Sequence, residues 1–141
     1  RYAEILLSYA EALNEVGRVE DAVTQTKLIR ARAGITAGTG SRYGIKTGIT
    51  QTEMRDLILN ERRIELAFEE QRFWDIRRWK IADQELNGPV FGIKIIRSAT
   101  GIYTYENVQA GTLVFSDKLY LMPLPFDETT KNSKLEQNPG W

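Results

Sequence analysis

The chain has 141 residues, the length of one ordinary domain, and its 19 basic residues balance its 19 acidic ones. This balance excludes the strongly positive surface typical of nucleic-acid-binding domains, so we expect no nucleic-acid partner. The absence of histidine and cysteine excludes histidine-based catalysis, histidine zinc sites, disulfides and thiol chemistry within these residues. No apolar run reaches the ~18 residues of a membrane-spanning helix, and we expect neither a metal nor a cofactor.

The first 34 residues predict two helices joined by a short turn. Residues 1–16 predict a helix that ends at Gly17, and its apolar stripe consists of Tyr2, Ile5, Leu6, Tyr9, Leu13 and Val16. Residues 19–33 predict a second helix that ends at Gly34, with a buried side formed by Ala22, Thr26, Ile29 and Ala33. Two helices within about 34 residues have the size of one tetratricopeptide-like unit, although the chain shows a single copy.

A glycine-rich segment follows at residues 34–50. The stretch from Gly38 to Gly44 is rich in glycine but lacks the Gly-Lys-Ser/Thr of a phosphate-binding loop, and no strand precedes it. We therefore interpret the segment as a flexible loop. Thr50 or Thr52 is expected to cap the next helix, because Glu53 follows Thr50 at capping-box spacing.

The remaining elements are a charged helical region, an extended region and a tail. The third helix is expected to run to about Glu70, and a shorter one from Arg72 to about Ala82. Residues 90–121 are rich in valine, isoleucine, tyrosine and glycine, which predicts short strands in a small β-hairpin or an extended region of loops. One helical turn is expected near Asp127, and the apolar anchors of the tail, among them Trp141, predict an ordered irregular end that packs back against the helices.

The third helix carries an unusual density of charge. Between Glu53 and Lys80 half of the residues are charged, seven acidic and seven basic. Glu61 and Glu65 lie one turn apart, which is compatible either with a catalytic pair of carboxylates or with a partly buried ion network. Because arginines are interleaved and the local charges cancel, we favour a structural network made of Glu61, Arg62, Arg63, Glu65, Arg72 and Arg78. Both glutamates are expected to be mostly buried and to contact arginines.

Two pairs of aromatic residues are candidates for ligand contact. Trp74 and Trp79 lie in a helical segment with other apolar residues, so we expect them to pack in the core. Tyr103 and Tyr105 alternate along a predicted strand and therefore share a face. They are either a cross-strand packing pair or the local contact for a sugar, and they are the only ligand-binding residues that we name.

Three segments together resemble the carboxy-terminal region of the SusD/RagB family. They are residues 1–15 with 29–34 (RYAEILLSYAEALNE and IRARAG), residues 58–79 (ILNERRIELAFEEQRFWDIRRW), and residues 121–141 from LMPLP to QNPGW. The match covers nearly the whole chain in the family's order. Two positions depart from the pattern: Glu70 stands where the family usually has glycine, and Trp141 replaces the usual tyrosine. The chain also begins at Arg1 without methionine or signal peptide, so we expect it to be a piece of a longer protein.

The resemblance implies a mostly α fold in which tetratricopeptide-like helix pairs form the scaffold of a single SusD/RagB carboxy-terminal domain over residues 1–141. It also implies a surface-exposed outer-membrane lipoprotein of Bacteroidetes-type bacteria. Such a protein binds glycans, starch among them, or sometimes peptides, and its partner is a TonB-dependent, SusC-like transporter. It is not an enzyme, and it is attached to the membrane through a lipid anchor that lies outside these residues. In the family, ligand contacts lie largely in loops upstream of this region.

Two other functions remain open at this point. The first is a helix-repeat scaffold for protein interaction without a small-molecule ligand. The second is a glycosidase that uses Glu61 and Glu65 as its carboxylate pair.

Overall fold

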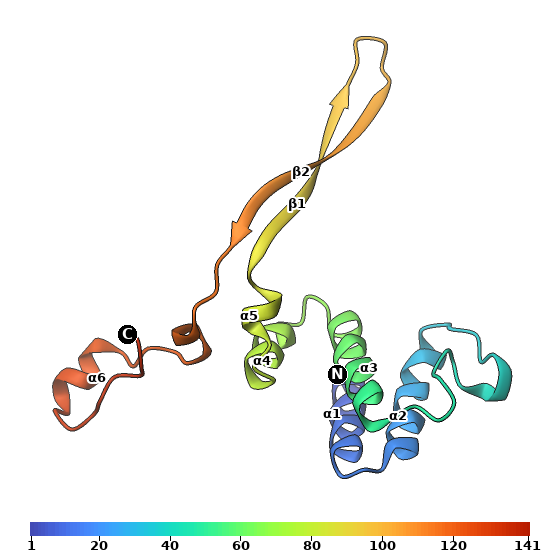
Figure 1. Cartoon of the computed structure of the whole chain (residues 1–141), viewed down its shortest axis with the longest axis horizontal. Coiled ribbons are helices and arrows are strands. Elements are labelled where there is room, and N and C mark those ends of the chain that lie inside the picture. The colour runs from blue at the N-terminus through green and yellow to red at the C-terminus, as the bar shows by residue number, and fades with distance from the viewer. The chain divides into compact units, whose positions relative to one another are not determined.

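The computed structural model describes residues 1–141, which form two compact units, Arg1–Trp74 and Asp75–Trp141 (Figure 1). Helices dominate the chain, and its two strands pair in one antiparallel sheet. The mostly α architecture expected from the sequence is therefore confirmed. No helix combines the length and the apolar character that crossing a membrane requires.

The first unit is built from three helices, α1 (Tyr2–Glu15), α2 (Val19–Arg32) and α3 (Gln51–Glu65). Helix α1 contacts both α2 and α3, and α2 also contacts α3. Small residues such as Ala10 and Ala22 allow the helices to approach closely, and Met54 and Ile58 of α3 complete the same core. The glycine-rich segment contains only the short 3-10 turn η1 (Thr39–Ser41), but it contributes Ile45 and Ile49 to this core.

The helix boundaries follow the capping residues. Gly17 and Gly34 have positive φ angles of 80° and 82°, the left-handed conformation that lets the chain turn after α1 and α2. At the start of α3 the expected capping box is present: the Glu53 backbone N–H donates to the Thr50 hydroxyl, and the Glu53 carboxylate accepts from the Thr50 backbone N–H at 2.8 Å.

Two predictions about the helices are wrong in part. Of the apolar stripe on α1, Leu6 and Leu13 are buried, whereas the remaining four members are exposed: Tyr2, Ile5, Tyr9 and Val16. The buried side of α1 consists instead of Ala3, Leu6, Leu7, Ala10, Leu13 and Asn14. Helix α3 ends at Glu65 and not near residue 70, because Phe68 and Glu70 both adopt a left-handed backbone conformation that interrupts the helix.

Helix α4 (Gln71–Arg78) is shorter than expected, since the chain turns at Lys80 before α5 (Ala82–Glu85) begins. In the second unit, Ile76, Ala82 and Phe115 form a small core, against which Leu119 and Tyr120 pack among others. Phe115 and Tyr120 meet edge to face, with ring centroids 4.9 Å apart.

The extended region is a hairpin of β1 (Gly88–Arg97) and β2 (Tyr103–Leu113), with a bulge beside Val90 and Phe91. Figure 1 shows the two strands as a long twisted ribbon. Nearly every residue of the hairpin is exposed, because no second layer covers either face of the sheet within this chain.

The tail after the 3-10 turn η2 (Asp117–Tyr120) includes α6 (Phe126–Lys131) and then returns along the chain. The side-chain amide of Gln137 bonds both the N–H and the C=O of Leu124, and Asn138 donates to Met122 O at 2.6 Å. The indole N–H of Trp141 donates to the carbonyl oxygens of Lys118 and Leu121. The tail packs back on η2 and the segment after it, and not on the long helices as expected, and Trp141 is 44% exposed.

Candidate functional site

One face of the β-hairpin carries the two tyrosines that the sequence singles out. The strand register pairs Tyr103 with Arg97 and Tyr105 with Ile95, and residues that pair directly lie on the same face. The side chains are 54% and 68% exposed, so both rings are accessible to solvent. The Arg97 guanidinium lies 6.0 Å from the centre of the Tyr103 ring.

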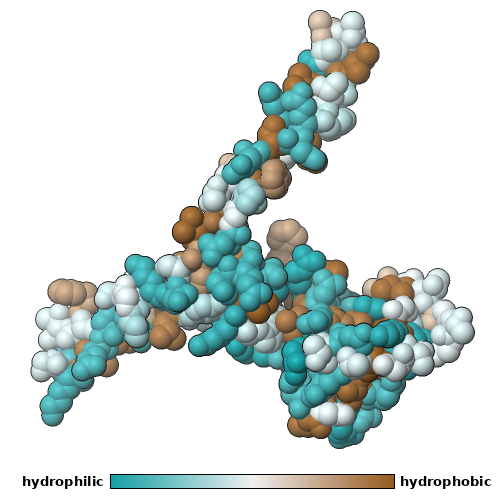
Figure 2. All heavy atoms as spheres, viewed as in Figure 1, coloured by the Kyte–Doolittle hydropathy of each residue, from teal (hydrophilic) through white to brown (hydrophobic).

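The same face continues along both strands. On β2 the tyrosines are followed by Asn107 and Gln109, and the residues opposite these two on β1 are Ile93 and Phe91. The face thus combines aromatic rings, amides and aliphatic side chains, and Figure 2 shows hydrophobic residues recurring along the hairpin. Residues two apart on a strand are separated by about 7 Å. Two exposed phenol rings at this spacing, followed by amides, can stack on sugar rings and bond their hydroxyl groups.

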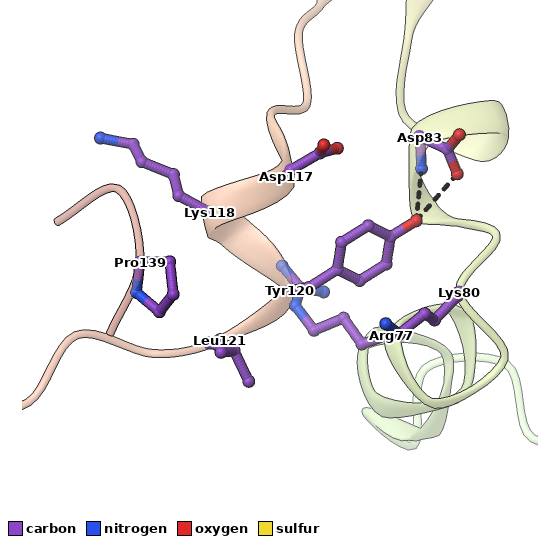
Figure 3. A pocket seen from close by; sticks show the side chains of 8 residues that line it. All are labelled: Arg77, Lys80, Asp83, Asp117, Lys118, Tyr120, Leu121 and Pro139. Carbon is purple, nitrogen blue, oxygen red and sulfur yellow. Dashed lines mark hydrogen bonds between the residues drawn. The ribbon is translucent and has the colours of Figure 1, made fainter. Parts of the chain in front are cut away.

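A pocket of about 570 Å³ lies in the second unit, and no sequence pattern pointed to it. Figure 3 shows its lining, which comes from the end of α4 through α5 and from η2 with the tail: Arg77, Lys80, Asp83, Asp117, Lys118, Tyr120, Leu121 and Pro139. Its volume falls in the range of small-molecule sites. The lining includes cationic, anionic and apolar side chains. It therefore offers hydrogen-bond donors and acceptors to a ligand that is rich in hydroxyl groups.

Hydrogen bonds fix the wall of this pocket. The Tyr120 hydroxyl donates to Asp83 Oδ1 at 2.8 Å and accepts from the Asp83 backbone N–H at 3.2 Å (Figure 3). Loss of solvent around the phenol raises the pKa of Tyr120, which keeps this hydroxyl protonated as the donor. Arg77 Nε donates to Leu119 O, and the Lys118 ammonium lies 4.4 Å from the centre of the Trp141 ring. The pocket wall is therefore pre-organised by its own residues.

The two glutamates of α3 are mostly buried and pair with arginines from outside α3. Arg30 of α2 donates to Glu61 Oε2 through Nε at 3.0 Å and through a terminal nitrogen at 2.9 Å. Glu65 pairs with Arg32 of α2 and with Arg1. Both glutamate side chains are 12% exposed. This geometry ties α2 to α3 and pairs one carboxylate oxygen of each glutamate with arginine.

The arginines that the sequence named have other partners as well. Arg62 is buried and donates to the Ser8 hydroxyl of α1 at 3.1 Å, and Arg63 donates to Asn60. Arg78 pairs with Asp75 at 3.1 Å, and Arg72 is half-buried at the start of α4. The arginines that the structure pairs with Glu61 and Glu65 therefore come from outside the predicted set. The partners that the sequence analysis missed are Arg1, Arg30 and Arg32. All three are distant from the glutamates in sequence, and the signal available for Arg30 and Arg32 was their position in the last turn of α2.

The two tryptophans lie in different environments. Trp74 is exposed and packs edge to face on Phe73, with ring centroids 4.9 Å apart, so the expectation that it lies in the core is wrong. Trp79 is half-buried under the guanidinium of Arg78, which lies 4.8 Å from the ring centre.

Comparison with known proteins decides the family. The model of the SusD family matches residues 1–141, the whole chain. The chain belongs to the SusD family. Two curated SusD-like proteins of Formosa agariphila, P2 and P38, are 38% and 33% identical over 143 and 139 residues. They match 100% and 98% of this chain but only 25% and 23% of their own length.

A solved structure agrees with this assignment. The crystal structure of a SusD-like protein from Bacteroides fragilis superposes with a TM-score of 0.83 at 38% sequence identity. The superposition covers 100% of this chain and 25% of that one, so the chain spans about a quarter of its relatives. The resemblance to the SusD family that the sequence analysis described is confirmed. The site residues that we describe are those of this quarter only.

Proposed function

We propose that this protein is a surface glycan-binding lipoprotein of the outer membrane that delivers oligosaccharides to a TonB-dependent, SusC-like transporter. The observation that carries the proposal is the SusD-family match over all 141 residues. The lipid anchor is attached outside these residues. The protein binds and hands over its ligand without chemical change, and residues 1–141 supply mainly scaffold.

The local geometry supports a ligand of the sugar class. The exposed rings of Tyr103 and Tyr105 share one face of the hairpin with two amides. Arginine pairing of Glu61 and Glu65 favours a structural role over the hydrolysis of a glycosidic bond. We therefore assign the tyrosine pair as the local sugar contact and the glutamates to the scaffold.

A titration tests the proposal. The whole protein and the isolated 141-residue chain are titrated calorimetrically against the same oligosaccharides, chosen by screening the whole protein on a glycan array. We expect clear binding by the whole protein and weak or no binding by the isolated chain, because several convergent contacts are needed to offset the freedom lost on binding. Failure of the whole protein to bind any glycan contradicts the proposal and favours a scaffold without a small-molecule ligand.

The tyrosine pair has its own test. Replacement of Tyr103 and Tyr105 by alanine in the whole protein is expected to weaken glycan binding, since each stacked ring contributes about 1 kcal/mol. Phe126→Ala is the matched control, because Phe126 is another exposed aromatic residue and lies on α6, away from the hairpin strands in sequence. Unchanged affinity of the tyrosine double variant shows that the ligand contacts lie elsewhere.

The transporter is tested separately. A SusC-like transporter encoded beside the gene is expected to co-purify with the whole protein from outer membranes. Its absence from such preparations contradicts the delivery step and leaves glycan binding untouched.

A further inference from the structure

The pocket of about 570 Å³ in the second unit has a charge balance that favours an acidic ligand. Five of its lining residues are ionisable. Its cations are Arg77, Lys80 and Lys118, and its carboxylates are those of Asp83 and Asp117. Because the cations outnumber the carboxylates by three to two, the local potential attracts an anion rather than a cation.

Two of these charged groups already have partners inside the protein. The Tyr120 hydroxyl donates to Asp83 Oδ1, which leaves the second carboxylate oxygen of Asp83 for a ligand (Figure 3). Arg77 Nε donates to the Leu119 carbonyl, so this guanidinium is held against the wall of the pocket. Both groups are therefore positioned before a ligand arrives, which reduces the side-chain freedom lost on binding.

Two other charged groups have no partner within the chain. Lys80 and Asp117 are exposed, and neither side chain forms an ion pair or a hydrogen bond. Lys80 comes from the turn after α4, whereas Asp117 comes from the start of η2 (Figure 3). The ammonium of Lys118, in contrast, lies over the ring of Trp141. The pocket thus offers one free cation and one free carboxylate from two separate segments of the chain.

The apolar part of the lining suits a sugar ring. Tyr120, Leu121 and Pro139 line the same pocket, and Leu121 is half exposed. Such side chains can pack on the C–H face of a pyranose, while carboxylate oxygens accept hydrogen bonds from its hydroxyl groups. The carboxylates then serve the hydroxyl groups of the sugar, and the cations are left to neutralise an acid group on it.

We propose that this pocket binds a sugar unit that carries a carboxylate, such as a uronic acid residue of an acidic oligosaccharide. The ligand carboxylate pairs with Lys80, in the positive potential to which Arg77 contributes. The ligand hydroxyl groups donate to Asp117 and to the second oxygen of Asp83. The inference rests on the proposed function for the sugar class of the ligand, and it adds a charge to that ligand and a site apart from the hairpin.

Two probes that share a pyranose ring test the proposal. D-glucuronate has a carboxylate where D-glucose has a hydroxymethyl group. Each is titrated into the whole protein at neutral pH and low salt, and binding is followed by saturation-transfer difference NMR. We expect glucuronate to bind about fivefold more tightly than glucose, the upper range for one solvent-exposed ion pair. Added salt should weaken the binding of glucuronate and leave that of glucose unchanged.

Removal of a single charge locates the site. Lys80→Gln should lower the glucuronate affinity about fivefold, to that of glucose. The unfolding temperature should not change, because Lys80 has no partner to lose. Lys134→Gln is the matched control, since it makes the same change in charge at an exposed residue outside the pocket. A loss of glucuronate affinity in the Lys80 variant alone supports the proposal, and equal effects of the two variants overturn it.

Further outcomes separate the alternatives. Equal affinities for glucuronate and glucose overturn the proposal, because the carboxylate then contributes nothing. If acetate or glycine binds as tightly as glucuronate and displaces it, the pocket takes any carboxylate or amino acid, and this also overturns the proposal. If the whole protein binds the oligosaccharide chosen on the array but not glucuronate, this inference fails and the proposed function stands. If the whole protein binds no glycan of any kind, both fail.

Discussion

Glu70 adopts a backbone conformation that favours glycine. Its φ angle is 62°, in the left-handed region that costs a non-glycine residue about 1–2 kcal/mol. The resemblance to the SusD family predicts glycine at this position, so the strain coincides with the departure noted in the sequence.

We predict that Glu70→Gly stabilises the protein by up to about 1 kcal/mol, since the released strain exceeds the backbone entropy that glycine loses on folding. Urea unfolding of the two proteins measures the difference. Glu70→Ala is the control, because it removes the carboxylate but keeps the strained Cβ, and it should give no gain. A stabilisation of equal size by alanine contradicts the backbone explanation.

The Glu61–Arg30 pair is a second feature at the scale of single residues. Their side chains are 12% and 16% exposed, so removal of one partner leaves a largely buried charge. We predict that Glu61→Ala lowers the free energy of unfolding by about 3 kcal/mol. Glu20→Ala, which breaks the more exposed pair with Arg42, should cost less than about 1 kcal/mol. Denaturant unfolding of both variants measures these costs, and similar values contradict a structural role for the buried pair.

At the scale of elements, the start of α3 is sensitive to acid. A hydrogen bond from Lys46, followed by bonds from the Thr50 backbone and hydroxyl, lowers the pKa of Glu53 from 4.5 to about 2. A carboxylate with a lowered pKa in the folded state adds stability above its unfolded pKa, and this contribution is lost as the pH falls. The loss therefore occurs between about pH 4.5 and pH 2.

We predict that an NMR titration of the Glu53 carboxyl gives a midpoint near 2, and that Lys46→Met raises it. Glu53→Gln should remove the part of the acid sensitivity that belongs to this cap. A Glu53 midpoint at its ordinary value of 4.5 contradicts the capping geometry.

Some of the elements could be predicted from the sequence and others could not. The helix pair, the α3 cap and the hairpin were predictable, because glycine turns, the Thr50–Glu53 box and β-branched runs are local signals. The buried side of α1 was not, because both of its stripes have helical spacing and the larger residues occupy the exposed one. Close helix packing selects the small residues Ala3 and Ala10 for the interior.

The site could be predicted only in part, for a related reason. That Tyr103 and Tyr105 share a face follows from strand alternation alone. The pairing of Glu61 with Arg30 and the pocket beside Tyr120 depend on residues that are distant in sequence, and the spacing of charges within α3 carries no information about them.

At the scale of the whole molecule, the proposed function assigns scaffold and ligand contact to different residues. Glu61 ties α2 to α3 inside the first unit, whereas Tyr103 and Tyr105 are exposed on a hairpin of the second. Changes at the two places should therefore separate into two classes. Residues that only hold the scaffold alter the fraction of folded protein, and residues that touch the ligand alter its affinity.

We predict that Glu61→Ala lowers the unfolding temperature of the whole protein while its folded fraction keeps the glycan affinity of the wild type. The Tyr103→Ala/Tyr105→Ala variant should show the reverse, an unchanged unfolding temperature and a weaker affinity, because exposed rings contribute little to the core. Thermal unfolding and calorimetric titration of each variant against the same oligosaccharide provide the two measurements. If the Glu61→Ala protein is folded but has lost its glycan affinity, Glu61 belongs to the ligand site. If the wild-type protein releases shorter sugars from the oligosaccharide and the Glu61→Ala protein does not, Glu61 is catalytic.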